Sequence, residues 1–187
     1  MAGLVTAGMH WQALTRDVGD SLMAAENLLI AALSYPVLKA LHELTHGWLT
    51  KARGGAVREM GVMFLVFFPV PYVDASAAAA FPSKWHRAAV AAGGIFAETF
   101  VAAIAVMVWA AAEPGLVRAV AFNLVMIGGL STLVVNGNPL LKFDGYYVFS
   151  DLIEVPNLAQ RANKWWGHVV QRRVDRSPRR PAPGRGG

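Results

Sequence analysis

Long apolar stretches separated by short polar segments dominate this chain. Residues 27–50, 88–112 and 116–135 each form an uninterrupted, mainly apolar run. At about 1.5 Å per residue, each run is long enough to cross the ~30 Å hydrocarbon core of a bilayer as a helix. A further apolar run, residues 60–73, is too short to span and contains two prolines. The pattern predicts an all-α, multi-pass transmembrane helical bundle of about three core spans, with a short re-entrant or β-like membrane-associated segment.

Composition agrees with an integral membrane protein. Of the 187 residues, 55% are hydrophobic and 16% are charged, which is more apolar than a typical soluble domain. The chain has no cysteine, so a metal site would have to be built from His, Asp or Glu side chains. The net charge of +5 is concentrated in loops and in the C-terminal region. Beside membrane spans, such basic segments favour anionic lipid over nucleic acid, and we expect the bilayer as a partner and no nucleic acid.

The same pattern divides the chain into four parts. Residues 1–26 form an N-terminal flanking segment and residues 27–150 a membrane-embedded core. Residues 151–176 form a juxtamembrane segment, and residues 177–187 a basic tail rich in Pro, Gly and Arg that we expect to be disordered.

The placement of Lys and Arg predicts the orientation of the spans. The segment between the first and second spans is basic, whereas the turn between the second and third holds a single Arg. Basic loops stay on the cytoplasmic side, so this segment and the C-terminus are expected there. The basic residues of that segment are Lys51, Arg53, Arg58, Lys84 and Arg87.

The first span contains the sequence His42-Glu43-Leu44-Thr45-His46. Two histidines four residues apart lie on one helix face, where both imidazoles can reach one Zn²⁺. Glu43 is then placed to act as general base on a zinc-bound water. The alternative is a histidine pair hydrogen-bonded to its neighbours. That alternative is weakened because ionisable side chains inside a span are costly and generally functional.

A third protein ligand is needed if one coordination position is to remain open. Asp144 is the best candidate, because it follows the third span in a segment rich in Gly, Asn and Pro. Taken alone, Asp144-Gly145 is more typical of a plain turn, since Asp-Gly is a favoured turn pair.

The two motifs together change that interpretation. His42-Glu43-x-x-His46, followed by Asn136-x-x-Pro139-x4-Asp144-Gly145 after a later span, resembles the site-2 protease group of intramembrane zinc metalloproteases, in the peptidase M50 family. The strings HELTHGWLTKARGG and NPLLKFDGYY look most like the branch known as peptide zinc metalloproteases.

The resemblance implies a role for each motif residue. His42, His46 and Asp144 would bind Zn²⁺, and Glu43 would be the general base. Asn136 would contact the substrate or the reacting carbonyl. Pro139 and Gly145 would shape the chain that presents the aspartate. It also implies a bacterial cytoplasmic membrane protein with its active site near the cytoplasmic face, and a membrane protein or peptide as substrate.

The chain departs from this pattern in the second span. Many members of the family carry a Gly-Pro-x-x-Asn-like motif there, whereas this chain has Glu98 in place of the amide. Glu98 is either a buried carboxyl, protonated or bonded to a neighbouring helix, or a group that tunes the site or accepts a substrate amine. Lys39, four residues before Glu43, would pair with that glutamate or extend toward the membrane surface.

Two other classes of function remain open from the sequence. One is a non-proteolytic zinc-binding scaffold that works with a peptide-maturation or export partner. The other is a metal-transport protein that uses His42, His46, Glu98 and Asp144 as a cation path. Peptide-bond hydrolysis is favoured over both, because Glu43 and the Asp144-Gly145 pair are intact.

Overall fold

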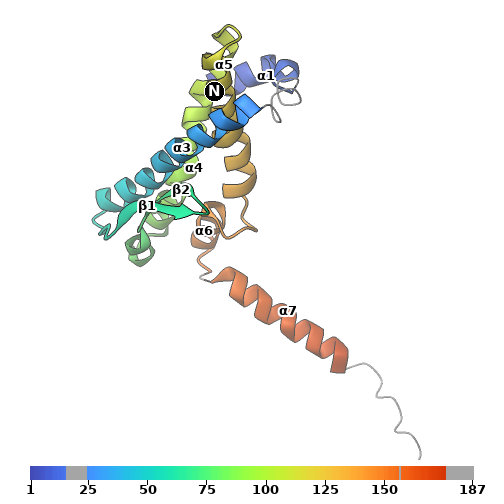
Figure 1. Cartoon of the computed structure of the whole chain (residues 1–187). Helices are drawn as coiled ribbons and strands as arrows, with labels where there is room; N and C mark the ends of the chain where they lie inside the picture. The colour runs from blue at the N-terminus through green and yellow to red at the C-terminus, as the bar shows by residue number, and fades with distance from the viewer. Residues whose placement is uncertain (16–24, 156, 176–187) are drawn as a thin grey trace, which may run out of the picture. The chain divides into compact units, whose positions relative to one another are not determined.

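The computed structural model describes residues 1–15, 25–155 and 157–175. The disordered tail predicted for residues 177–187 lies outside the described residues. The chain forms two compact units, Met1–Ile153 and Glu154–Gly187. The second unit contains α7, and the other helices and strands belong to the first (Figure 1). In chain order the elements are α1 (Ala2–Met9), α3 (Ala25–Ala52), β1 (Met60–Leu65), β2 (Phe68–Val73), η1 (Ser76–Ala80), α4 (Lys84–Ala111), α5 (Leu116–Val125), η2 (Met126–Asn136), α6 (Asp144–Leu152) and α7 (Leu158–Asp175).

Within the part of the chain that the structure describes, three helical segments are long and apolar enough to cross a membrane, namely α3, α4 and the continuous helix formed by α5 and η2. Their bounds match the three predicted spans closely. Helix α3 continues through Pro36, although proline removes a main-chain hydrogen bond there. The prediction of a mostly helical protein with three candidate spans is therefore confirmed.

Helix α3 shows the reversed polarity expected of a span. Its exposed face is apolar and its buried face carries both histidines. This arrangement suits a lipid environment, where ionisable groups turn toward the bundle interior. The outward residues are Leu29, Leu33, Val37, Leu41, Leu44 and Trp48, and the inward ones are Leu38, His42, His46 and Thr50.

Glycines allow the spans to approach closely. Gly94 of α4 lies directly against the imidazole of His42 on α3. A Cβ at Gly128 of η2 would stand 2.8 Å from the main-chain oxygen of Glu98 on α4. Small residues at such crossings are typical of helix packing in membranes. Here they bring α3, α4 and η2 together around the buried face of α3.

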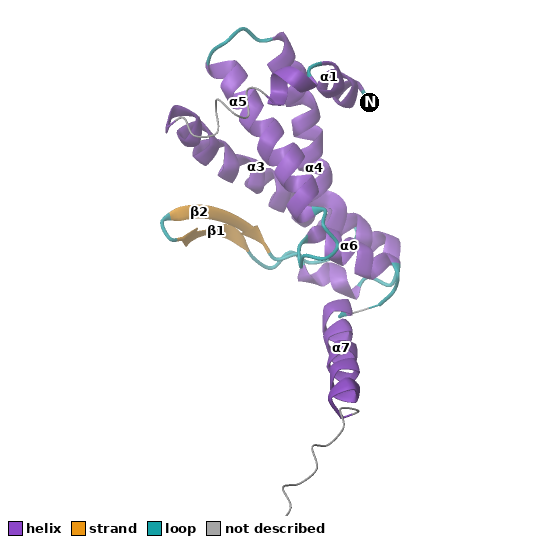
Figure 2. Ribbon diagram, turned by 90° about the vertical axis from the view of Figure 1, so that its right-hand side faces the viewer, coloured by secondary structure: helices purple, strands orange, loops and turns teal. Residues whose placement is uncertain are grey.

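The apolar segment after the first span forms a β-hairpin rather than a helix, so its predicted β-like character is confirmed. Strands β1 and β2 are antiparallel, in register from Met60–Val73 to Leu65–Phe68. Figures 1 and 2 show the hairpin beside the helical bundle. Strand β2 runs along α3, because the ring of Phe68 lies 5.6 Å from that of Tyr35 and Val73 covers Gly47. Strand β1 is exposed along its whole length.

The third span changes its winding at Met126, where α5 gives way to the π-helical segment η2. Main-chain bonds five residues apart mark this segment, including Gly137 N to the oxygen of Thr132 at 2.9 Å. π-Helical turns are rare and are frequently found at functional sites. The segment ends at Asn136, from where a short turn leads into α6, which begins at Asp144.

Candidate metal centre

Three side chains from the two sequence motifs meet at one point. His42 and His46 come from successive turns of α3, and Asp144 is the first residue of α6. The Nε2 atoms of the two histidines are 3.1 Å apart. Asp144 Oδ2 lies 2.9 Å from His42 Nε2 and 3.4 Å from His46 Nε2. This cluster could hold a metal ion, as the sequence predicted for these residues.

The spacing of these three atoms fits a small tetrahedral cation. Ligands bound to zinc at ~2.0–2.1 Å with tetrahedral angles stand about 3.3 Å from one another. The observed separations of 2.9, 3.1 and 3.4 Å bracket that value. Three protein ligands also leave one position open, which is the arrangement of catalytic rather than structural zinc sites.

Contacts on the far side of each imidazole leave its Nε2 atom facing the centre. His46 Nδ1 lies 2.7 Å from the main-chain oxygen of Val90 on α4. A carbonyl only accepts, so Nδ1 carries the proton and Nε2 presents its lone pair. His42 Nδ1 faces a carboxylate oxygen, Glu98 Oε1, at 3.2 Å in an ion-pair contact that lacks hydrogen-bond geometry.

Three acceptors therefore converge with no proton between them in the neutral tautomers. Asp144 Oδ2 is buried and makes no hydrogen bond among the described residues. A buried carboxylate oxygen without a donor is costly. A cation bound by His42, His46 and Asp144 removes that cost.

The charge of Asp144 suits this role. Burial raises the pKa of its carboxyl, but the imidazoles of His42 and His46, when they are protonated in the absence of a metal, lower it by more. The pKa consequently lies well below its ordinary value. Asp144 is a carboxylate at neutral pH and is ready to bind a cation.

Tight main-chain packing positions Asp144 beside the two histidines. A Cβ at the buried Gly145 would stand 2.8 Å from the main-chain oxygen of Asn136 and would collide with that of Gly137. Gly145 thus lets the start of α6 rest on the end of η2. Pro139 lies in the exposed turn between them.

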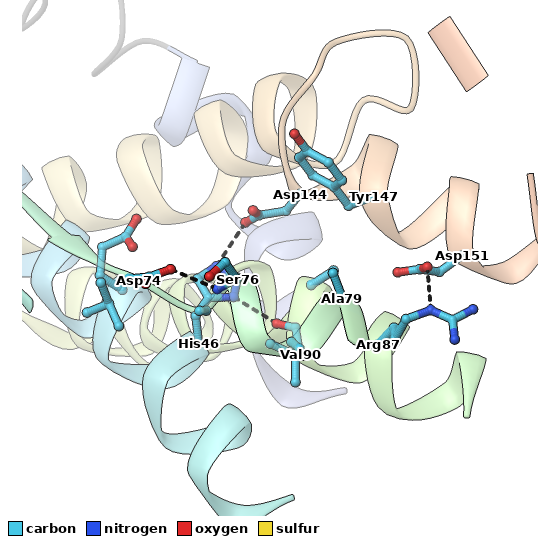
Figure 3. A pocket seen from close by; sticks show the side chains of 14 residues that line it. His46, Asp74, Ser76, Ala79, Arg87, Val90, Asp144, Tyr147 and Asp151 are labelled. Carbon is cyan, nitrogen blue, oxygen red and sulfur yellow. Dashed lines mark hydrogen bonds and ion pairs between the residues drawn. The ribbon is translucent and has the colours of Figure 1, made fainter. Parts of the chain in front are cut away.

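An ion pair holds α6 against α4 two helical turns beyond Asp144. Arg87 Nε donates to Asp151 Oδ1 at 2.8 Å, and the same guanidinium donates to the main-chain oxygen of Phe81. Val90, whose oxygen fixes His46, is one turn along α4 from Arg87. Helix α4 therefore contacts both His46, through the Val90 carbonyl, and the helix that begins with Asp144, through Arg87 (Figure 3).

A cavity of about 430 Å³ opens beside the cluster. Glu43, His46 and Asp144 all line it, so the predicted general base and two of the ligands share one space. Figure 3 shows this space with Ala79 and Val90 on one side and Tyr147 near Asp144. Small apolar residues form much of the remaining wall, namely Val73, Ala75, Ala78, Ala79, Val90 and Ala91.

Asn136, Lys39 and Glu98 gather on the other side of His42. The Asn136 amide nitrogen lies 3.5 Å from Glu98 Oε2, and Asn136 is not among the residues that line the cavity. Lys39 Nζ lies 2.7 Å from Glu98 Oε1. Its partner is therefore Glu98, whereas the helical spacing had indicated Glu43. Glu98 is fully buried and bonded to a neighbouring helix, as one of its two interpretations predicted.

Several contributing groups gave no signal in the sequence. The Val90 carbonyl belongs to the main chain, so the identity of the side chain says nothing about it. Arg87 and Asp151 are far apart in the chain and belong to no recognisable motif. A carboxylate at position 98 inside an apolar span was the one visible hint of the contacts around His42.

Comparison of the chain with protein-family models, curated proteins and solved structures finds no match.

Proposed function

We propose that this protein is an intramembrane zinc metalloprotease that hydrolyses peptide bonds of a membrane-embedded or membrane-associated protein or peptide. One observation carries the proposal. His42 and His46 converge with Asp144, which lies far away in the sequence, and Glu43 lines the cavity beside them. The resemblance of both motifs to site-2 proteases supports the same conclusion.

The donor set favours zinc as the metal. Two imidazole nitrogens and one carboxylate oxygen are the ligand types of many hydrolytic zinc sites, and no thiol is available. When bound, zinc polarises a carbonyl and makes water acidic enough to attack near neutral pH.

Glu43 performs the proton transfers in this mechanism. Its half-buried carboxylate faces the cavity where a scissile bond would lie. It accepts a proton from the attacking water and delivers it to the leaving amine. Asn136 is the residue that we propose to help position the reacting carbonyl, after exchanging its contact with Glu98.

The substrate must enter in an extended conformation, because a helical peptide bond hides its carbonyl. The small side chains of the cavity wall leave room for a substrate side chain beside the catalytic groups. Strand β1 pairs only with β2 among the described residues, so its outer edge is open to strand addition by an extended peptide. An export or maturation partner would deliver such a peptide.

We further propose that the catalytic end of the bundle lies at the cytoplasmic face of a bacterial cytoplasmic membrane, which the basic residues at the end of α3, in the connection and at the start of α4 support. Both His46 and the hairpin lie at that end of α3.

The two alternative functions predict different chemistry. A cation path through Glu98 is disfavoured, because the Lys39 ammonium already occupies its carboxylate and would repel a passing cation. A scaffold would keep the metal but would not need Glu43, which faces the cavity.

Metal analysis followed by peptide cleavage tests the proposal. The detergent-purified protein should contain about one zinc per chain, and His46→Ala and Asp144→Ala should each lose it. Zinc that is indifferent to Asp144 would contradict the assignment.

Cleavage would then be measured on a proteome-derived peptide library by mass spectrometry of new N-termini. Glu43→Gln is the matched control, because it keeps the metal ligands and the side-chain shape but removes the base. New termini with wild type and none with Glu43→Gln are expected. Equal cleavage by both proteins would exclude this mechanism, and zinc without cleavage would favour the scaffold.

A further inference from the structure

Glu98 is the meeting point of three spans. It lies within α4 with 0% of its surface exposed. Side chains from α3 and η2 reach its two carboxylate oxygens. Glu98 Oε1 lies 2.7 Å from Lys39 Nζ and 3.2 Å from His42 Nδ1. Glu98 Oε2 contacts Thr132 Oγ1, and it lies 3.5 Å from Asn136 Nδ2.

The two oxygens serve different elements. Oε1 faces α3, which supplies both histidine ligands. Oε2 accepts a hydrogen bond from Thr132 and faces Asn136 at the end of η2, from where the chain turns into α6 and Asp144. One carboxylate therefore bridges the helix with two ligands and the segment that leads to the third.

The contact with His42 has a specific consequence for the metal centre. An imidazole ligand binds best when its other nitrogen donates to a fixed acceptor, which sets the tautomer and the ring plane. The main-chain oxygen of Val90 performs this task for His46. Among the described residues, Glu98 Oε1 is the carboxylate oxygen that faces His42 Nδ1, at 3.2 Å in an ion-pair contact without hydrogen-bond geometry, while Asp144 faces Nε2.

Charge explains why a carboxylate stands there instead of an amide. Lys39 is one turn before His42 on α3, and its ammonium contacts the same oxygen, Oε1. Without the negative charge of Glu98, that ammonium would face the metal centre uncompensated in a medium of low dielectric constant. Glu98 both orients His42 and neutralises Lys39.

We propose that Glu98 is a positioning residue of the metal centre, which fixes the imidazole of His42 for metal binding and shields the centre from the charge of Lys39. The proposal rests on the metal centre of the proposed function. Glu98 touches neither metal nor substrate and acts through His42.

The test compares zinc affinities of detergent-purified full-length variants by competition with a chromophoric chelator. Glu98→Gln keeps the shape of the side chain but removes its charge. Its zinc affinity should fall about 10- to 100-fold, the usual effect of losing such a partner. The visible absorption bands of the Co²⁺-substituted protein should shift as well, because the ligand field at His42 changes.

The double variant Lys39→Met/Glu98→Gln removes the ammonium together with its partner, so it is expected to fold even where the single variant does not. Its zinc affinity should lie between those of wild type and Glu98→Gln. A wild-type affinity in this variant would show that Lys39 and Glu98 form a self-contained pair, and would overturn the proposal.

Asn123→Leu is the matched control, because it breaks another buried polar contact between spans, Asn123 Nδ2 to Asn27 Oδ1 at 2.7 Å. It should lower thermal stability without changing zinc affinity. If Glu98→Gln behaves like this control, with unchanged affinity and Co²⁺ bands, Glu98 serves packing alone and the proposal is wrong.

Failure of the metal centre itself would look different. In that case wild type would hold no zinc, or Asp144→Ala would bind it as tightly as wild type. A metal centre that depends on Asp144 but not on Glu98 would overturn only the positioning role.

Discussion

Replacement of Gly94 by alanine should damage the metal centre without touching any ligand. Gly94 lies on α4 where it faces the ring of His42. A Cβ added there would lie under 3.0 Å from three ring atoms, including both nitrogens. The ring must therefore move, and it is held between Glu98 and Asp144.

The size of the effect follows from this geometry. Ordinary contacts of a Cβ lie at 3.4–4 Å, so the ring must retreat by about 1 Å, several times the ~0.2 Å tolerance of a metal–ligand distance. Forcing an extra methyl into a packed interior costs about 1–3 kcal/mol. If the zinc-bound protein carries this cost and the zinc-free protein does not, Gly94→Ala should bind zinc about 5- to 150-fold more weakly than wild type.

Chelator competition on the purified protein measures this change, and thermal unfolding of the metal-free protein reports separately on folding. Gly129→Ala is the matched control. It is also a glycine of a span, but its added Cβ would stand 3.6 Å from that of Ala102, an ordinary contact. Wild-type zinc affinity in both variants would refute the placement of His42 against α4 or its role as a ligand.

Three further changes probe other parts of the site. Gly145→Ala would press a Cβ onto the main chain of the preceding turn, which cannot yield; zinc affinity measured by chelator competition should fall about tenfold or more. Ala79→Phe would fill the cavity beside the centre; peptide cleavage should be lost while zinc content stays at the wild-type level, and loss of both would argue that the change disturbs the fold. Because the chain has no cysteine, Arg58→Cys and Glu113→Cys can be labelled individually in intact cells with a membrane-impermeant maleimide. Only the cysteine at position 113 should react, and the reverse pattern would invert the proposed orientation.

The sequence determined the local features of this protein. Span lengths follow from how many consecutive residues are apolar, and three such runs appear as helices close to the predicted bounds. The pairing of His42 with His46 follows from the helical repeat alone, because residues four apart share a face. The apolar run at residues 60–73 was visible as a segment too short to span and was predicted to be re-entrant or β-like, because prolines disfavour a helix interior.

Only the tertiary structure decided what surrounds these motifs. Asp144-Gly145 alone was indistinguishable from a turn, and Asp144 meets the two histidines because Gly145 packs closely against the end of η2 and so places the start of α6. The partner of Lys39 was misjudged, since helical spacing reports neighbours within α3 but not the carboxylate that α4 inserts beside it. The carbonyl of Val90 carries no sequence signal at all. Local periodicity places side chains on faces, whereas contacts between faces depend on how distant segments pack, and that information is spread over the whole chain.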